Sequence, residues 1–168
     1  MPVKIKPGDF LEIKLAETHY VYACKLADSI SVGFYNQCYA LPCRDIEELA
    51  NAPVLMQLGI FSYTFKKHRW PAIGWAPLAP TWELKEPLMW KKEQKDCPPD
   101  GSSERYDYFL VENERVTNQV TREQCRGLGR WAVYVPDTIE DMLRRHFGIA
   151  LDGSAVEPLH FYDQILAE

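Results

Sequence analysis

Apolar and polar side chains alternate along the first third of the chain. Leu11, Ile13 and Leu15 fall on one side of an extended backbone, and Glu12 and Lys14 fall on the other. This period of two is typical of a strand with one face in the core and the other toward solvent. The pattern therefore predicts a half-buried β-strand near the start of the chain.

Three more segments have strand composition. Residues 19–26 and 30–35 are rich in Tyr and Val, and the short connection between them suits a hairpin. Residues 54–65 resume this composition, and Gly59 inside them predicts a bulge or a close backbone approach. The first three strands together predict an antiparallel meander.

Helices are predicted where capping patterns occur. Asp45 is followed three residues later by Glu48, as in a capping box, and Pro53 ends this short helix. The clearest helix covers residues 138–147 and ends at Gly148. Its apolar face is Ile139, Met142, Leu143 and Phe147, its expected capping box is Asp137 with Glu140, and a further capping box is Thr121 with Gln124.

These elements indicate an α+β fold that is mainly β. We expect a twisted antiparallel sheet, or an SH3-like partly open barrel, in the N-terminal part, with a few short helices. The length suits one domain over residues 1–168. Within it we expect a β-rich core at 1–90, a polar loop at 91–103, and an acidic mixed α/β part at 104–168 packed on the core.

Negative charge is concentrated at the C-terminal end of the chain. The formal net charge is −5, and the whole excess lies in residues 101–168, because residues 1–100 carry equal numbers of basic and acidic side chains. An acidic surface repels phosphate backbones and attracts basic partners. This distribution disfavours direct binding of nucleic acid and favours a basic protein partner.

Composition also bears on the compartment. No apolar run approaches the roughly 18 residues of a membrane span, and residues 1–6 lack the apolar region of a signal peptide. The five cysteines are odd in number and show no CxxC spacing, which argues against a disulfide framework or a zinc site. We therefore expect a cytoplasmic protein, either a monomer or a weak dimer.

No local motif indicates catalysis. The chain has no HExxH, GxSxG, GxxxxGK[ST] or GxGxxG pattern, so we expect no catalytic residues, no cofactor and no metal. Two alternatives stay open. Dispersed Cys and His side chains could form an enzyme site, and the basic cluster at residues 66–69 beside Trp70 could mark a small β-rich adaptor or nucleic-acid-associated module.

The chain resembles the immunity protein 26 family of bacterial polymorphic-toxin and contact-dependent growth inhibition systems. The resemblance covers about residues 4–90 and is strongest where Gly59-Ile60-Phe61 leads into Lys67-His68-Arg69-Trp70-Pro71-Ala72-Ile73-Gly74 and Pro77-Leu78. It is also carried by Lys6-Pro7-Gly8-Asp9, Gly33-Phe34-Tyr35, Asp45-Ile46-Glu47-Glu48-Leu49 and Pro53-Val54-Leu55. It implies a mainly β inhibitor without catalytic machinery that neutralises a cognate toxin. Trp70, Pro71, Ile73 and Gly74 are interpreted as scaffold.

Physical reasoning adds an expected contact surface. Many such toxins are cationic nucleases, and an acidic inhibitor would capture a basic toxin rapidly. We therefore expect the partner surface to draw on the acidic C-terminal part of the chain. The expected contact residues are Glu112, Glu114, Glu140, Asp141, Asp152 and Glu157.

Overall fold

The computed structural model describes residues 5–27, 30–61, 64, 69–79, 89–94, 106–112 and 115–167. The chain forms two compact units. The first contains Met1–Lys85 and Val133–Phe161, and the second contains Glu86–Ala132 and Tyr162–Glu168. The second unit is therefore inserted in the first in sequence, and each unit is described separately below.

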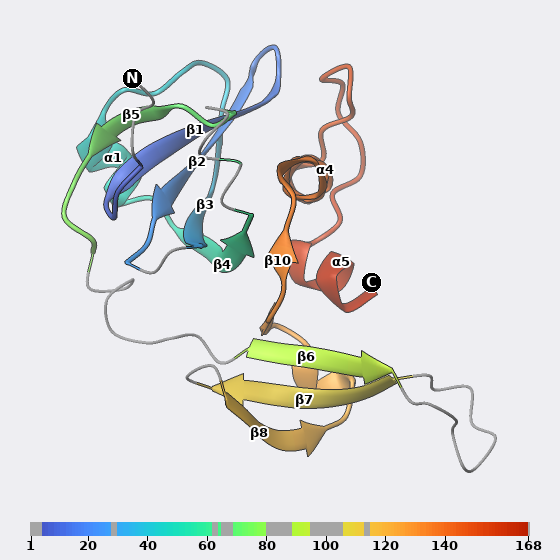
Figure 1. The fold of residues 1–168 in the computed structure, drawn as a ribbon. Helices are drawn as coiled ribbons and strands as arrows, with labels where there is room; N and C mark the ends of the chain where they lie inside the picture. Colours follow the sequence, from blue (N-terminus) through green and yellow to red (C-terminus); the bar gives the residue numbers. More distant parts are fainter. Residues whose placement is uncertain are drawn as a thin grey trace. The chain divides into compact units, whose positions relative to one another are not determined.

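The first unit is built on an open six-stranded sheet (Figure 1). Its order is β10-β4-β3-β2-β1-β5, and all neighbours are antiparallel except β10, which runs parallel to β4. Because β10 and β5 are edges, the sheet does not close into a barrel. The strands are β1 (Asp9–Ala16), β2 (His19–Lys25), β3 (Ser31–Tyr39), β4 (Val54–Ile60), β5 (Ala72–Trp75) and β10 (Val133–Tyr134).

The predicted meander and its alternation are confirmed. Strands β1, β2 and β3 pair in sequence order. Leu11, Ile13 and Leu15 are buried, whereas Lys14 is exposed and Glu12 is partly buried. The mainly β class predicted from the pattern is therefore confirmed, with the open twisted sheet as its N-terminal form.

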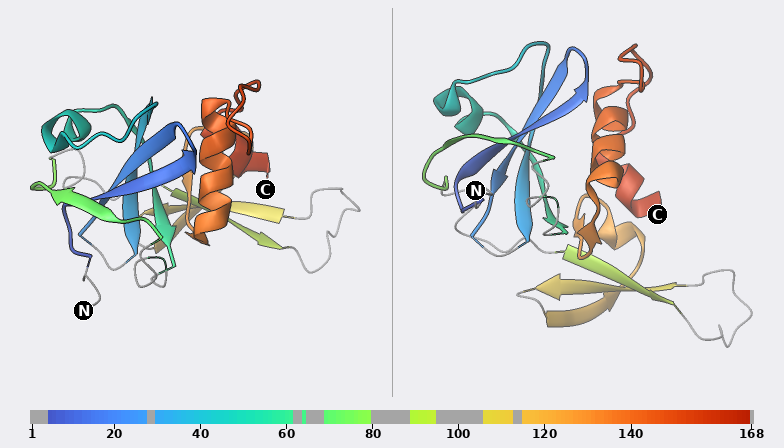
Figure 2. Two further views of the ribbon diagram at one scale, coloured as in Figure 1. Left: turned by 90° about the horizontal axis from the view of Figure 1, so that it is seen from above. Right: turned by 45° about the horizontal axis from the view of Figure 1, so that its top comes forward.

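Helices cover both faces of this sheet (Figure 2). Helix α1 (Ile46–Ala50) places Leu49 in an apolar cluster with Phe10, Tyr22 and Tyr35. The expected cap is present, because the Asp45 carboxylate accepts the Glu48 backbone N–H at 3.0 Å. Helix α4 (Pro136–Phe147) lies on the opposite face, where it contacts β1.

Helix α4 begins earlier than predicted and without the expected capping box. Pro136 occupies its first turn, and Val135 at the N-cap makes no side-chain cap hydrogen bond. Asp137 and Glu140 instead bond to Arg69. The end is as predicted, since Gly148 adopts the left-handed conformation with φ of 66°.

Strand β4 ends at Ile60, so the predicted strand over 54–65 is too long. Residues 62, 63 and 65 lie outside the described residues. Of the two alternatives predicted at Gly59, the bulge is wrong, because the extra residue of β4 is Leu55: Phe34 pairs with Met56 and Tyr35 with Val54. Gly59 pairs regularly, with Ser31 on one side and Val133 on the other.

The second unit contains a four-stranded sheet of order β8-β7-β6-β9. Its strands are β6 (Met89–Gln94), β7 (Tyr106–Glu112), β8 (Arg115–Val120) and β9 (Gly129–Arg130). The 3₁₀ turn η1 (Glu123–Cys125) follows β8. The Thr121–Gln124 capping box before it is confirmed, because the Gln124 side chain accepts the Thr121 N–H at 2.9 Å. The last helix is α5 (Phe161–Ala167), of which Phe161 belongs to the first unit.

The polar loop predicted at 91–103 is wrong for its first four residues. Residues 91–94 belong to β6, while 95–103 lie outside the described residues. The lysines are compatible with a strand because the Lys91 ammonium lies 5.8 Å from the Phe109 ring centre and the Lys92 ammonium lies 4.6 Å from that of Tyr106. The chain also divides elsewhere than at this loop, since Val133–Phe161 belongs with the N-terminal strands.

Candidate partner-binding surface

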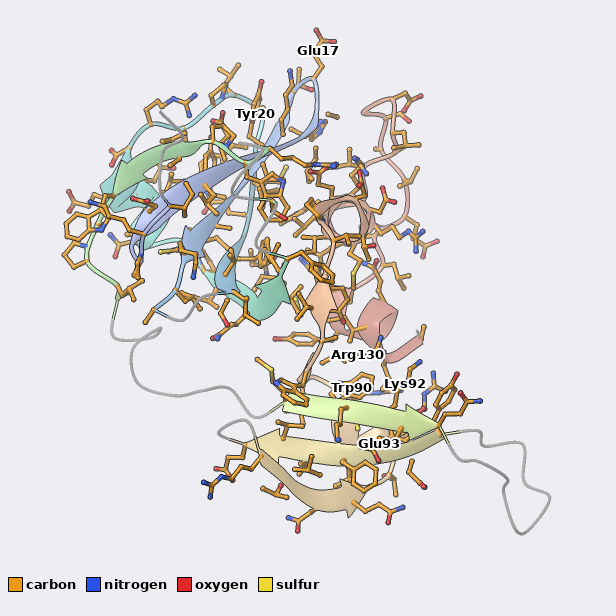
Figure 3. The ribbon with its side chains drawn as sticks, viewed as in Figure 1. Glu17, Tyr20, Trp90, Lys92, Glu93 and Arg130 are labelled. Carbon is orange, nitrogen blue, oxygen red and sulfur yellow. The ribbon has the colours of Figure 1, made fainter. Side chains whose placement is uncertain are left out.

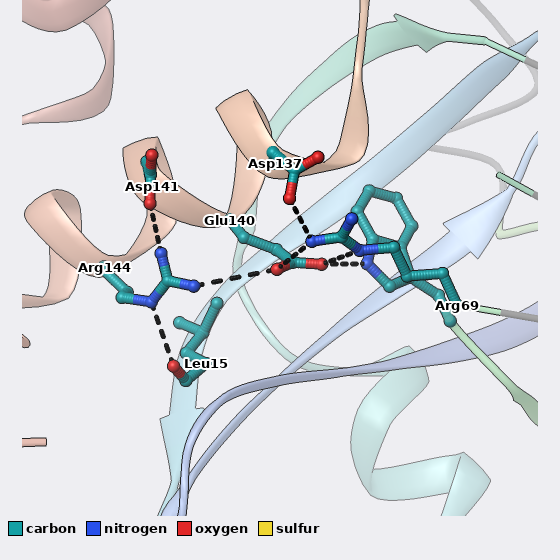
Figure 4. A network of polar contacts seen from close by, with 7 residues as sticks. Leu15, Arg69, Asp137, Glu140, Asp141 and Arg144 are labelled. Atoms are coloured by element: carbon teal, nitrogen blue, oxygen red, sulfur yellow. Dashed lines mark hydrogen bonds and ion pairs between the residues drawn. The ribbon is translucent and has the colours of Figure 1, made fainter. Parts of the chain in front are cut away.

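A buried carboxylate joins α4 to the segment before β5 (Figure 4). Glu140 accepts two hydrogen bonds of 2.8 Å from the Arg69 guanidinium and one of 2.9 Å from the Trp70 indole N–H. Trp70 is itself buried and meets the Phe34 ring edge-on at 6.0 Å. Arg69 also bonds to Asp137 at 2.6 Å, and this guanidinium lowers the pKa of the Asp137 carboxyl. The network fixes the first turns of α4.

Arg144 fixes the second half of α4. Its Nε donates to the Leu15 carbonyl of β1 at 3.0 Å, and its guanidinium pairs with Asp141 (Figure 4). A longer contact of 3.7 Å joins Arg144 to Glu140. Side chains from two turns of the helix are thus held to the sheet, so α4 is a rigid support for the chain that follows it.

The segment that follows, residues 149–160, is called the acidic-apolar loop. Its backbone is tied to the end of α4, because Val156 donates to the Gly148 carbonyl and Leu159 to the Arg145 carbonyl, both at 2.8 Å. Its tip is a turn in which the Asp152 carboxylate accepts the Ser154 N–H at 2.9 Å and the Ser154 hydroxyl at 2.6 Å. These bonds also lower the pKa of Asp152. The loop therefore has a defined conformation and a charged tip.

The far end of this loop is held by a histidine. The Phe161 N–H donates to His146 Nδ1 at 3.2 Å, so the imidazole proton is on Nε2, which lies 2.8 Å from the Asn36 amide oxygen. Burial, and secondarily the neighbouring His160, lower the pKa of His146. The neutral imidazole is the form that satisfies both hydrogen bonds.

The acidic-apolar loop exposes large apolar side chains. Leu151 is 81% exposed, Val156 48% and Leu159 47%. Asp152 and Glu157, which are both exposed, stand between these apolar positions in the chain. Apolar side chains displayed together on an ordered loop are typical of a binding surface, and interleaved carboxylates suit a basic partner.

A hollow of about 330 Å³ adjoins this loop. Its wall comes from strands β2 and β3, from the end of α4, and from the loop itself. The lining residues are His19, Cys38, Tyr39, Ala40, Phe147, Gly148, Ile149, Gly153, Ser154 and Ala155. A side-chain carbon added to Gly153 would lie 3.5 Å from the Ala16 side chain and 3.9 Å from His19 Nδ1. The turn at Gly153 is therefore packed against the β1–β2 turn, at whose tip Glu17 projects (Figure 3).

The structure gives the six acidic residues expected to contact a partner different surroundings. Glu140 is buried and bonded internally, which corrects the role expected for it. Asp141 is exposed but paired with Arg144. The structure brings Asp152 and Glu157 together on the acidic-apolar loop, places Glu112 in the second unit, and leaves Glu114 outside the described residues.

Sequence reasoning missed the apolar half of this surface. Nothing in the local spacing of Leu151 and Val156 shows that they face solvent. The two acidic turns, at Asp152-Gly153 and Glu157-Pro158, were the available signal, because turns bring flanking residues to the surface.

Three of the described thiols, those of Cys24, Cys38 and Cys125, lack the environment of a catalytic nucleophile. Burial raises the pKa of Cys24 to about 12, and it also raises the pKa of Cys38 and Cys125. A reactive cysteine needs the opposite shift, because the thiolate is the nucleophile. In the part of the chain that the structure describes, no group of three or more His, Cys, Asp and Glu side chains could hold a metal ion.

The described helices are all too short or too polar to pass through a lipid bilayer. Comparison of the chain with family models, with curated proteins and with solved structures finds no match in any of the three.

Proposed function

We propose that this protein is an immunity protein that binds and neutralises a basic cognate toxin of a bacterial polymorphic-toxin or contact-dependent inhibition system. The observation that carries the proposal is the acidic-apolar loop. It combines a strongly exposed leucine with an ionised carboxylate on a backbone that is already ordered by hydrogen bonds. Because a preformed surface loses little conformational entropy on binding, it suits a tight inhibitor.

Several other features support this reading. The net charge of −5 favours fast capture of a cationic protein. The resemblance of residues 4–90 to the immunity protein 26 family points to the same function. Trp70 and Gly74 act as scaffold here, since Trp70 is buried and a side chain on Gly74 would collide with Ile46 of α1. The family's strongest segment therefore serves the fold and leaves the loop for recognition.

The direct experiment is co-expression with the product of the gene immediately upstream. We expect the two proteins to purify as an equimolar complex. Leu151→Ser should weaken the complex, because leucine at this position is an apolar anchor. Val116→Ser is the matched control, since Val116 is an aliphatic residue that is 46% exposed and lies on β8 of the second unit. A purified chain that forms no complex with this product would contradict the proposal.

A second candidate function rests on the second unit. In β6 and β7 the register places Lys92 opposite Tyr108 and Trp90 opposite Leu110, so these side chains share one face (Figure 3). Lys92 lies over Tyr106, and Arg130 lies 5.8 Å from the Trp90 ring centre. Trp90 is itself buried, so the exposed Tyr106 ring beside Lys92 is the part of this face that suits a nucleic-acid-associated module.

Fluorescence anisotropy with single-stranded oligonucleotides separates the two functions. The immunity function predicts no binding at physiological salt. Binding that is lost in Lys92→Ala would favour the module. Mutating the basic cluster at 66–69 would separate the two functions less clearly. Arg69 is bonded to Glu140 and Asp137, so its loss would also disturb the fold.

A further inference from the structure

The hollow beside the acidic-apolar loop is lined by residues other than the exposed leucine that carries the proposed function. Resting on that function, we propose that this hollow receives one basic side chain, a lysine or an arginine, from the toxin. The complex would then be anchored at two places, with an apolar contact at Leu151 and a cationic side chain inserted between the loop and the β1–β2 turn.

The hollow is large enough to admit a long side chain. Its volume of about 330 Å³ lies at the lower end of the range in which small-molecule sites are found. Phe147, Ile149 and Ala155 supply apolar wall, which suits the methylene stem of a long basic residue. Ser154 and the Cys38 thiol supply polar wall near the same space.

The charges around the hollow favour a cation. Glu17 projects from the β1–β2 turn, and Asp152 stands at the tip of the loop, next to the glycine that packs against this turn. Asp152 is held in its ionised form by the two bonds from Ser154. Among the lining residues the only side chain that can carry positive charge is His19. A lysine or arginine in the hollow therefore lies near the Asp152 carboxylate, which is bonded to the lining residue Ser154.

The thiol of Cys38 can report whether the hollow is filled. Cys38 lines it and is partly exposed, so an alkylating reagent can reach the thiol in the free protein. Cys43 is also partly exposed but lies beside α1, where its thiol contacts the Asp45 carbonyl at 3.8 Å. The two thiols belong to the same unit, and only Cys38 lines the hollow.

The test is iodoacetamide labelling of the free chain and of its complex with the upstream gene product, read at each cysteine by mass spectrometry. We expect the complex to slow labelling of Cys38 at least tenfold and to leave the rate at Cys43 unchanged. A complex in which Cys38 reacts as fast as in the free chain overturns this proposal and leaves the proposed function intact. Failure of the wild-type chain to form any complex overturns both.

Matched variants give a second readout. Ala155→Trp fills the hollow from an exposed position, and Ala72→Trp makes the same change at an exposed position of β5. We expect the first to raise the Kd for the toxin at least tenfold and the second to leave it unchanged. Asp152→Asn keeps the acceptor for Ser154 but removes the charge, and it should raise Kd less than the filled hollow. Equal affinities for all three variants and the wild type would overturn the proposal.

The same labelling experiments test two other candidates for filling the hollow, a second copy of this chain and a small molecule. If a second copy of this chain filled the hollow, Cys38 labelling in the free chain would fall as its concentration rises. If a small molecule filled it, Cys38 would already be protected in the freshly purified chain and would become reactive after unfolding, dialysis and refolding. Either result would overturn the assignment to a toxin side chain.

Discussion

The indole N–H of Trp70 donates to the Glu140 carboxylate at 2.9 Å, although the two residues are 70 positions apart in the chain. The Glu140 carboxylate is buried, and a second donor group, the Arg69 guanidinium, neutralises its charge. An acidic residue that local sequence assigns to the solvent face of a helix is thereby part of the interior. It fixes the helix that carries the candidate binding surface.

Removing this charge should destabilise the protein. Glu140→Gln removes one of the two carboxylates that bond to the Arg69 guanidinium. It also places a side-chain amide opposite the donors of Arg69 and Trp70. We expect the free energy of unfolding to fall by about 2 kcal/mol, below the full cost of breaking a buried ion pair because Arg69 is partly exposed. Urea unfolding followed by Trp fluorescence measures it. Asp137→Asn should have a much smaller effect, and equal effects of the two variants would contradict this account of the network.

Gly148, which ends α4 just before the acidic-apolar loop, should be more sensitive to substitution by alanine than Gly127. Left-handed backbone costs a non-glycine residue roughly 1–2 kcal/mol. At Gly148 the added carbon would also lie 2.6 Å from the Val156 carbonyl oxygen, so Gly148→Ala should cost more than that. Gly127→Ala is the control, since φ is 78° there but the carbon meets nothing within 4 Å. Thermal unfolding of both variants compares the two costs, and equal losses would refute the steric argument.

Stability should fall as the solution is acidified through the histidine range. The folded pKa of His146 lies below its ordinary value of 6.5, so the folded state binds this proton less readily than the unfolded chain. The contribution of His146 is therefore complete above pH 6.5 and is lost as the pH falls through the folded pKa. Urea unfolding at pH 7.5, 6.5 and 5.5 measures the loss. His146→Gln, which is uncharged throughout, should flatten this dependence, and an unchanged slope would argue against it.

The thiols should react slowly with iodoacetamide at neutral pH. Burial raises the pKa of Cys24 to about 12 and raises that of Cys38 and Cys125, so little thiolate is present. We expect Cys24 and Cys125, which are buried, to be labelled only after unfolding, and Cys38 to react more slowly than free cysteine. Any of these thiols reacting faster than free cysteine would support the alternative of an enzyme with dispersed Cys and His residues.

Much of the fold could be predicted because it depends on local pattern. Alternation places Leu11 and Ile13 on the buried face of β1, and the Asp45 cap and the Gly148 terminus follow from the hydrogen bonds that helix ends require. In each case the residues that decide the outcome are close together in the chain. Pattern reasoning is strongest where this condition holds.

The rest depends on partners that are distant in the chain. The capping box expected from Asp137 and Glu140 is replaced by bonds to Arg69, which lies 71 positions before Glu140. Strand β6 was not predicted because its lysines are typical of a polar loop. Their aromatic neighbours on β7 cannot be identified from spacing alone. The exposure of Leu151 depends on how the acidic-apolar loop folds back on α4. For the candidate site, sequence therefore identified the charges but missed the apolar contacts.

Protection of growth tests the central claim most directly. Cells that express the upstream gene product should stop growing, and co-expression of this chain should restore growth. Leu151→Ser combined with Asp152→Asn should restore it poorly, whereas Val116→Ser should restore it fully at the same protein level. If the wild-type chain failed to protect cells in which both proteins are present, the account of this protein as a toxin inhibitor would be contradicted.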